Sequence, residues 1–166
     1  MSYRVRSMAL VHEKLYQSAD LARIDFGEYS RSLLNYLWRA HGSAAASIKL
    51  TFDLEPVFLP VDISVPCGLI LNELAGNALK HAFAGKAAGE VTVSLKHSVN
   101  GCISLRVRDD GVGLPPGFDW RNAMSLGLRL VNMLAGQIDA SLEVNERQGT
   151  EFVVVFSHQE QEDGGT

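Results

Sequence analysis

The order of two kinds of hydrophobic spacing along the chain places the strongest constraint on its fold. Alternating apolar residues, the pattern of half-buried strands, occur in five segments: 48–54, 90–97, 102–108, 138–145 and 150–157. Apolar residues at helical spacing occur in three segments: 25–42, 66–83 and 125–136. The pattern predicts an α+β fold, a two-layer α/β sandwich with helices on one face of a mixed, mostly antiparallel sheet.

Local signals predict where these segments begin and end. Asp25 is expected to cap the first helix, with Glu28 at the capping-box position, and Gly42 is expected to end that helix. Pro66 suits the first turn of the second helix, which is expected to run to about residue 83. The Gly- and Pro-rich stretch 110–124 is expected to be a mobile loop.

The first 18 residues predict an additional N-terminal helix with a coiled-coil seam. The residues at the two seam positions are Met1, Val5, Met8, His12 and Leu15. A polar connector follows at 17–24, and the acidic tail 158–166, with two glycines near its end, is expected to be disordered.

Size and composition exclude several classes of protein. The 166 residues suffice for one well-buried core but not for two ordinary domains. A net charge of −4 argues against nucleic-acid binding. No apolar run approaches the ~20 residues that span a bilayer, and no signal peptide is recognised, so we expect a cytoplasmic protein without direct membrane contact. Cys67 and Cys102 are expected to be free thiols, and the scattered histidines predict no zinc site.

Three polar residues share one side of the helix expected at 66–83. On a helical wheel, Glu73, Asn77 and Lys80 lie opposite the apolar residues that would face the sheet. Amide or carboxylate oxygens there can ligate Mg²⁺, and Lys80 can pair with phosphate. For this stripe alone, a solvated helix face with an incidental Glu–Lys pair is the favoured interpretation.

Three further segments combine glycine with polar residues. Asp109-Asp110-Gly111-Val112-Gly113 follows a strand, and its glycines allow a ligand to approach the backbone closely. Ser125-Leu126-Gly127-Leu128 leads into a helix whose first N–H groups can bind an anion. Gly149-Thr150 begins the last strand. Each segment alone is explained by an ordinary turn or helix cap.

Taken in order, these segments resemble the ATPase superfamily of histidine kinases, gyrase and heat-shock chaperones. Residues 71–83 (Leu-Asn-Glu-Leu-Ala-Gly-Asn-Ala-Leu-Lys-His-Ala-Phe) resemble the N box, and Asp109-x-Gly111-x-Gly113 the G1 box. Ser125-x-Gly127-Leu128 resembles the G2 box, and Gly149-Thr150 the closing Gly-Thr. The resemblance runs from about 47 to 157 and implies the Bergerat ATP-binding fold, with ATP and Mg²⁺ as ligands.

The N-terminal part is similar to the second dimerisation helix and linker of one bacterial sensor-kinase subfamily. The similarity rests on residues 6–16 together with Ile24-Asp25-Phe26 and Tyr29. It implies a partial dimerisation helix and linker at 1–24, an ATP-binding catalytic domain at 25–157 and a tail at 158–166. It also implies a homodimer of the full-length protein.

The resemblance implies roles for the residues that match the boxes. Asp109 would accept the adenine amino proton, supported by Thr150, and Gly111 and Gly113 would shape the base pocket. Gly127 and Leu128 would meet the phosphates at the end of the ATP lid. Further contacts to the nucleotide are implied for Asn72, His81 and Ser125.

In the N box, Asn77 would ligate Mg²⁺ and Lys80 would contact phosphate. Glu73 and Lys80 are the implied catalytic residues. Many histidine kinases have Asn at the position of Glu73, whereas hydrolysing ATPases and serine-kinase anti-sigma factors have Glu. Two roles for Glu73 stay open, that of a base and that of a residue ordering Mg²⁺ and its water. The first G2 position, usually Gly, is Ser125 here, and the lid at about 114–125 is short.

His12 beside Glu13 suggests a phosphate acceptor, since the carboxylate could take the imidazole proton. The family places its acceptor on the first dimerisation helix, upstream of the residues present here. A packing role in the helical hairpin is therefore expected for His12.

The implied function is a histidine kinase module that transfers the γ-phosphoryl group of ATP to a histidine on another helix, with a response regulator as downstream partner. One alternative is a serine-protein kinase of the anti-sigma-factor type, suggested by Glu73. Another is a non-catalytic, ATP-switched protein-binding module. The seam helix at 1–18 favours the histidine kinase, because a monomeric anti-sigma factor has no use for it.

Overall fold

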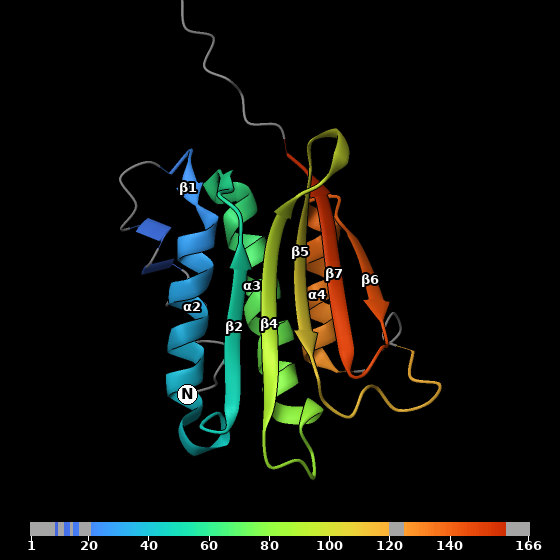
Figure 1. Ribbon diagram of the computed structural model, residues 1–166. Helices are drawn as coiled ribbons and strands as arrows, with labels where there is room; N and C mark the ends of the chain where they lie inside the picture. Colours follow the sequence, from blue (N-terminus) through green and yellow to red (C-terminus); the bar gives the residue numbers. More distant parts are fainter. Residues whose placement is uncertain (1–8, 10–11, 14, 17–20, 120–124, 159–166) are drawn as a thin grey trace, which may run out of the picture.

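The computed structural model describes residues 9, 12–13, 15–16, 21–119 and 125–158. Its main sheet has five strands in the spatial order β2-β4-β5-β7-β6 (Figure 1). The strands are β2 (Ile48–Leu54), β4 (Gly89–His97), β5 (Cys102–Asp109), β6 (Ser141–Asn145) and β7 (Thr150–Ser157). β2 pairs with β4 in parallel and all other neighbours pair antiparallel, which confirms the mixed, mostly antiparallel sheet.

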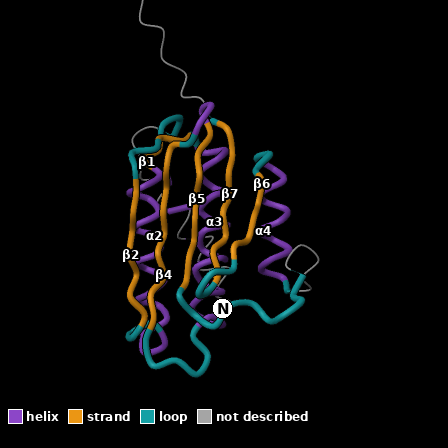
Figure 2. Tube along the Cα trace, turned by 45° about the vertical axis from the view of Figure 1, so that its right-hand side comes forward, coloured by secondary structure: helices purple, strands orange, loops and turns teal. Residues whose placement is uncertain are grey.

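Three helices, α2 (Phe26–His41), α3 (Val61–Asn77) and α4 (Leu126–Gln137), lie on one side of this sheet (Figures 1 and 2). The core forms where their apolar sides meet the inward residues of the strands, such as Leu71 on α3, Val93 on β4 and Leu105 on β5. The result is the two-layer arrangement expected from the spacing of apolar residues.

The caps of α2 agree with the sequence. The Asp25 side chain accepts a hydrogen bond from the backbone N–H of Glu28 at 3.2 Å. Gly42 ends the helix with a φ of 53°, a left-handed value that favours glycine.

The start of α3 differs from the prediction. The helix begins at Val61, after Pro60, and the N–H groups of Ile63 and Ser64 both donate to the Pro60 carbonyl. Pro66 therefore lies inside α3 and not in its first turn. Proline is common in the first turn of a helix, but this preference can be overridden by packing. Here the burial of α3 favours a helix that already begins before Pro66, at Val61.

Two smaller differences concern short or turning segments. β1 (Ile24–Asp25) and β3 (Phe58–Leu59) form a separate antiparallel pair that was not predicted, because two residues are too few to show alternation. β6 begins at Ser141 and not at 138, because Asp139 has a φ of 52° and turns the chain out of α4.

The N-terminal helix is only partly described. Ala9, His12, Glu13, Leu15 and Tyr16 are helical, and Leu15 is 1% exposed and packs in the core. His12 is exposed, and its ring stacks on the Tyr16 ring at a centroid distance of 4.8 Å. Other seam positions and the tail after residue 158 lie outside the described residues. Among the described residues, none of the helices has the length and apolar character needed to span a bilayer.

Candidate functional site

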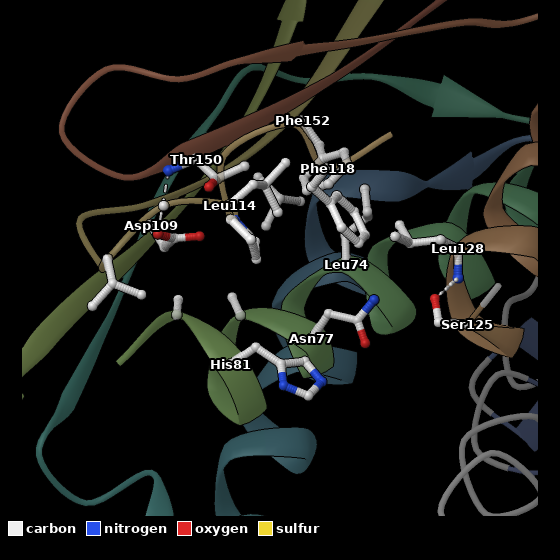
Figure 3. A pocket seen from close by; sticks show the side chains of 16 residues that line it. Leu74, Asn77, His81, Asp109, Leu114, Phe118, Ser125, Leu128, Thr150 and Phe152 are labelled. Atoms are coloured by element: carbon white, nitrogen blue, oxygen red, sulfur yellow. Dashed lines mark hydrogen bonds between the residues drawn. The ribbon is translucent and has the colours of Figure 1, made fainter. Parts of the chain in front are cut away.

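A cavity of about 460 Å³ opens between α3 and the ends of β5 and β7 (Figure 3). It has the size of a small-molecule site. The predicted site residues that line it are Asn77, His81, Asp109, Gly113, Ser125, Leu128 and Thr150. The cavity thus brings together residues from all four of the segments singled out in the sequence.

Most of the cavity wall is apolar. α3 and the turn after it supply Leu74, Ala78 and Ala82. The loop after β5 contributes Phe118, which the sequence did not single out because that loop has no periodic pattern. Val107 and Phe152, on β5 and β7, also went unnoticed, although strand alternation places them on the same face as Asp109 and Thr150. Such walls suit the faces of a flat aromatic ligand.

Asp109 is the acidic residue that lines this wall, and it is 7% exposed. Its Oδ1 accepts hydrogen bonds from the backbone N–H of Gly111 at 3.0 Å and of Thr150 at 3.3 Å. Figure 3 shows the second carboxylate oxygen on the cavity side. Burial raises the pKa of the Asp109 carboxyl above its ordinary value, and the two backbone hydrogen bonds oppose this shift. The carboxylate is therefore held in one orientation, with an acceptor facing the ligand space.

A π-helical turn, Ala78–Ala82, follows α3 and positions the loop after β5. The N–H of Val112 donates to the Ala82 carbonyl at 2.7 Å. A Cβ on Gly111 would lie 2.0 Å from that same carbonyl oxygen, so only glycine fits there. Gly111 does not line the cavity but fixes the distance between the π turn and the loop. π-helical turns of this kind are frequent at functional sites.

The far end of the cavity is more polar. Asn77 and His81 reach it from α3 and the π turn, and Ser125 and Leu128 from the start of α4 (Figure 3). Ser125 caps α4, its Oγ accepting from the Leu128 N–H at 3.4 Å. The positive end of the α4 dipole and the Asn77 amide therefore line the same cavity, an arrangement that suits an anionic ligand with a bound cation.

The stripe of Glu73, Asn77 and Lys80 does not form as expected. Glu73 is 4% exposed and Asn72 3%, and neither lines the cavity, whereas Lys80 is exposed outside it. The wheel assumed one buried side, but α3 is buried nearly all round, in contact with both α2 and α4. The π turn also changes the angular position of Lys80 relative to Asn77.

The sequence matches two family models. Residues 63–160 match the family described as "Histidine kinase-, DNA gyrase B-, and HSP90-like ATPase". The chain belongs to this ATPase family. Residues 1–41 match a second model, described as "Histidine kinase". Together with the relatives below, the two matches show the ATP-binding catalytic domain of a sensor histidine kinase.

Two proteins similar to this chain are named as histidine kinases. "Blue-light-activated histidine kinase 2" of Erythrobacter litoralis is 35% identical over 93% of this chain and 45% of its own length. "Sensor histidine kinase PdtaS" of Mycobacterium tuberculosis is 32% identical over 91% of this chain and 30% of its own. The chain therefore spans less than half the length of either relative.

A solved structure agrees with these matches. The histidine kinase domain of a blue-light-activated histidine kinase from Erythrobacter litoralis superimposes with a TM-score of 0.81 at 28% identity. The superposition covers 92% of this chain and 72% of that domain.

Proposed function

We propose that this kinase domain binds ATP with Mg²⁺ and transfers the γ-phosphoryl group to a histidine on the first dimerisation helix of the full-length protein, upstream of the residues present here. The observation that carries the proposal is Asp109, a fixed carboxylate in the wall of an apolar cavity. The domains proposed are a partial dimerisation helix with its linker at 1–24, the ATP-binding catalytic domain at 25–157 and the acidic tail at 158–166.

The cavity supports adenine as the base. The Asp109 oxygen on the cavity side is an acceptor, and the adenine 6-amino group is a donor (Figure 3). Guanine has an acceptor, O6, at the same position, so two acceptors would face each other away from water. The apolar walls formed by Leu74, Ala82 and Phe152 would cover the faces of the ring.

The polar end supports the triphosphate. Gly127 and Leu128 at the start of α4 would meet the phosphate oxygens, with Ser125 and His81 beside them. The Gly127 N–H would donate to phosphate, because the Leu128 N–H already donates to Ser125 Oγ. Mg²⁺ prefers oxygen ligands and takes few from protein, so the Asn77 amide oxygen together with phosphate and water oxygens fits it. Among the described residues there is no group of three or more His, Cys, Asp and Glu that could hold a metal without the nucleotide.

The residues outside the cavity have indirect roles in this proposal. Glu73 and Asn72 are buried in α3 and do not line the cavity, and Glu73 would order the metal site through water more readily than act as a base. Lys80 would reach the phosphate only after ATP has bound and the lid, at about 114–125, has closed over it. Catalysis would rest on positioning and charge stabilisation, which Asn77, Lys80 and the α4 N-terminus supply. A response regulator and a second copy of the chain are the proposed protein partners.

The experiment is a titration of ATP and GTP against the native chain and Asp109→Asn. The amide keeps an oxygen for the Gly111 and Thr150 N–H groups but can present its NH₂ to the ligand. We expect ATP affinity to fall roughly tenfold to a hundredfold, since hydrogen bonds to charged groups contribute about 1.5–3 kcal/mol. The native chain should bind GTP weakly, and Asp109→Asn should increase the affinity for GTP relative to that for ATP.

Asp110→Asn is the matched control. Asp110 is the next residue, is exposed and bonds the Glu90 N–H instead of facing the cavity, so the same charge change should leave ATP affinity unaltered. Equal affinity of the native chain for both nucleotides would remove Asp109 as the base-reading residue.

A further inference from the structure

The sheet face opposite the helices carries a second hollow, which we call the arginine groove. It has a volume of about 510 Å³ and is lined by Arg106, Arg108, Asn145, Arg147 and Glu151. β5 supplies the first two arginines, β6 and its turn supply Asn145 and Arg147, and β7 supplies Glu151. None of these residues lines the nucleotide cavity.

Strand alternation separates the groove from the cavity. Val107 and Asp109 point to the helix side of β5, so Arg106 and Arg108 point to the other side. In the pairing of β5 with β7, Arg108 lies opposite Glu151 and Asp109 lies opposite Thr150. The groove is thus a distinct surface on the same two strands.

Glu151 holds part of the groove in a fixed arrangement. Its Oε1 accepts a hydrogen bond from the Asn145 amide at 3.2 Å and lies 3.7 Å from Arg106 Nη1. Arg106 Nε also donates to the Ser104 hydroxyl at 3.2 Å. The Glu151 side chain is only 21% exposed, whereas that of Arg106 is 47% exposed. Arg106 is therefore oriented by its neighbours while its side chain stays about half exposed.

The groove keeps an excess of positive charge. Three arginines face one carboxylate, and among the described residues neither Arg108 nor Arg147 forms an ion pair. This excess occurs in a chain whose net charge is −4, so it is a local feature and not a general property of the surface. Several guanidinium groups on one face, two of them outside any ion pair between described residues, favour a ligand that carries several planar anions.

We propose that the arginine groove binds an acidic segment of a protein partner in an extended conformation. Arg106 and Arg108 are two residues apart on one strand, which separates their Cα atoms by about 6.6 Å. Alternate side chains of an extended peptide have the same spacing, so two carboxylates at positions i and i+2 match the two guanidinium groups. The acidic pI of 5.7 argues against nucleic acid, whose binding domains are basic overall.

The test uses a blocked, fluorescent hexaglutamate peptide, with fluorescence anisotropy measured at low salt because exposed charges are screened. The variant is Arg108→Gln with Arg147→Gln, both exposed and outside the core. We expect saturable binding to the native chain and a loss of about tenfold in the variant, the sum expected for two exposed ion pairs.

Lys49→Gln with Lys96→Gln is the matched control. These lysines belong to β2 and β4, change the net charge by the same amount, and are already paired with Glu90 and Asp53. The control should bind within twofold of the native chain, and both double variants should bind ATP as the native chain does. Absence of saturable binding to the native chain, or an equal loss in the two double variants, would overturn the proposal.

Two competitors separate the acidic segment from other anions. Inorganic phosphate and a short single-stranded oligonucleotide are added to the native complex at matched total charge. We expect neither to displace hexaglutamate under these conditions. Displacement by phosphate would make the groove a small-anion site, and displacement by the oligonucleotide would make it a nucleic-acid site, either of which contradicts the proposal.

Discussion

Burial and hydrogen bonding act in opposite directions on Asp109, and burial prevails, so its pKa in the folded chain lies above the ordinary value of 3.8. A folded-state pKa above the unfolded one favours the protonated form on folding. The stability that Asp109 contributes is therefore fully present below its unfolded pKa and is lost as pH rises through its folded pKa. The folded chain is therefore less stable with Asp109 ionised, the form that would bind adenine, than with Asp109 protonated.

Asp109→Asn should remove this pH dependence, because the amide does not titrate. The free energy of unfolding of the variant, minus that of the native chain, should increase from pH 4 to pH 7. Urea denaturation at several pH values between these limits measures the difference. A difference that stays constant over this range would mean that the carboxylate is not destabilised by its surroundings.

Asn77→Ala should abolish the effect of Mg²⁺ on ATP affinity while leaving stability nearly unchanged. Alanine removes the amide oxygen from the cavity, and substitution of a half-exposed helical residue normally alters stability by only about ±0.5 kcal/mol. Calorimetric titration of ATP with and without Mg²⁺ measures this. Asn35→Ala, an exposed asparagine on α2, is the control and should keep the native response.

For single residues, the order of the polar and glycine-containing segments along the sequence predicted which polar side chains lie close together in the fold. Asn77, Asp109 and Thr150 come from distant segments, and the structure places all three at one cavity. Glu73 was misplaced because its exposure depends on how α2 and α4 pack around α3, which a helical wheel does not contain. Phe118 was missed because a loop residue has no periodicity to reveal it.

Among the elements, the π turn Ala78–Ala82 and the loop after β5 depend on each other through Gly111. Gly111→Ala should destabilise the chain by about 1–3 kcal/mol, the usual cost of overpacking, because the new Cβ would meet the backbone of Ala82. ATP affinity should fall as well, since the loop carries the wall beside Asp109. Urea denaturation and ATP titration measure the two effects.

Gly136→Ala is the control for this substitution. Gly136 lies in α4, and a Cβ there would meet nothing within 4 Å. Alanine is the better helix former by up to about 1 kcal/mol, so this variant should be as stable as the native chain or more so. Equal stability of the two alanine variants would show that the loop can move away from the π turn at little cost.

The helices and the long strands were predictable because each has enough residues to show its period. The start of α3 was not, because Val61, Ile63 and Val65 are β-branched and precede a proline, so local preference disfavours the helix that packing imposes. The π turn was not predictable either, because its sequence is compatible with an ordinary last turn of α3.

For the molecule as a whole, the isolated chain should bind Mg-ATP without phosphorylating itself. His12 is exposed and stacked on Tyr16, and the proposed phosphate acceptor is a histidine on a different helix. Incubation with γ-labelled ATP, followed by a count of protein-bound label, is the measurement. Label that disappears in His12→Ala would contradict the proposal and make His12 the acceptor.

The parallel pairing of β2 with β4 has a consequence for the order in which the chain assembles. β4 and β5 are joined by only a short turn and can associate early, whereas β2 reaches β4 only after α3 has crossed over the sheet. Asn77 lies on that crossover, so the nucleotide has no complete site until the slow, long-range step is finished. Bound ATP would then slow unfolding and leave the rate of folding unchanged. It would stabilise the domain once folded, without assisting the folding reaction itself.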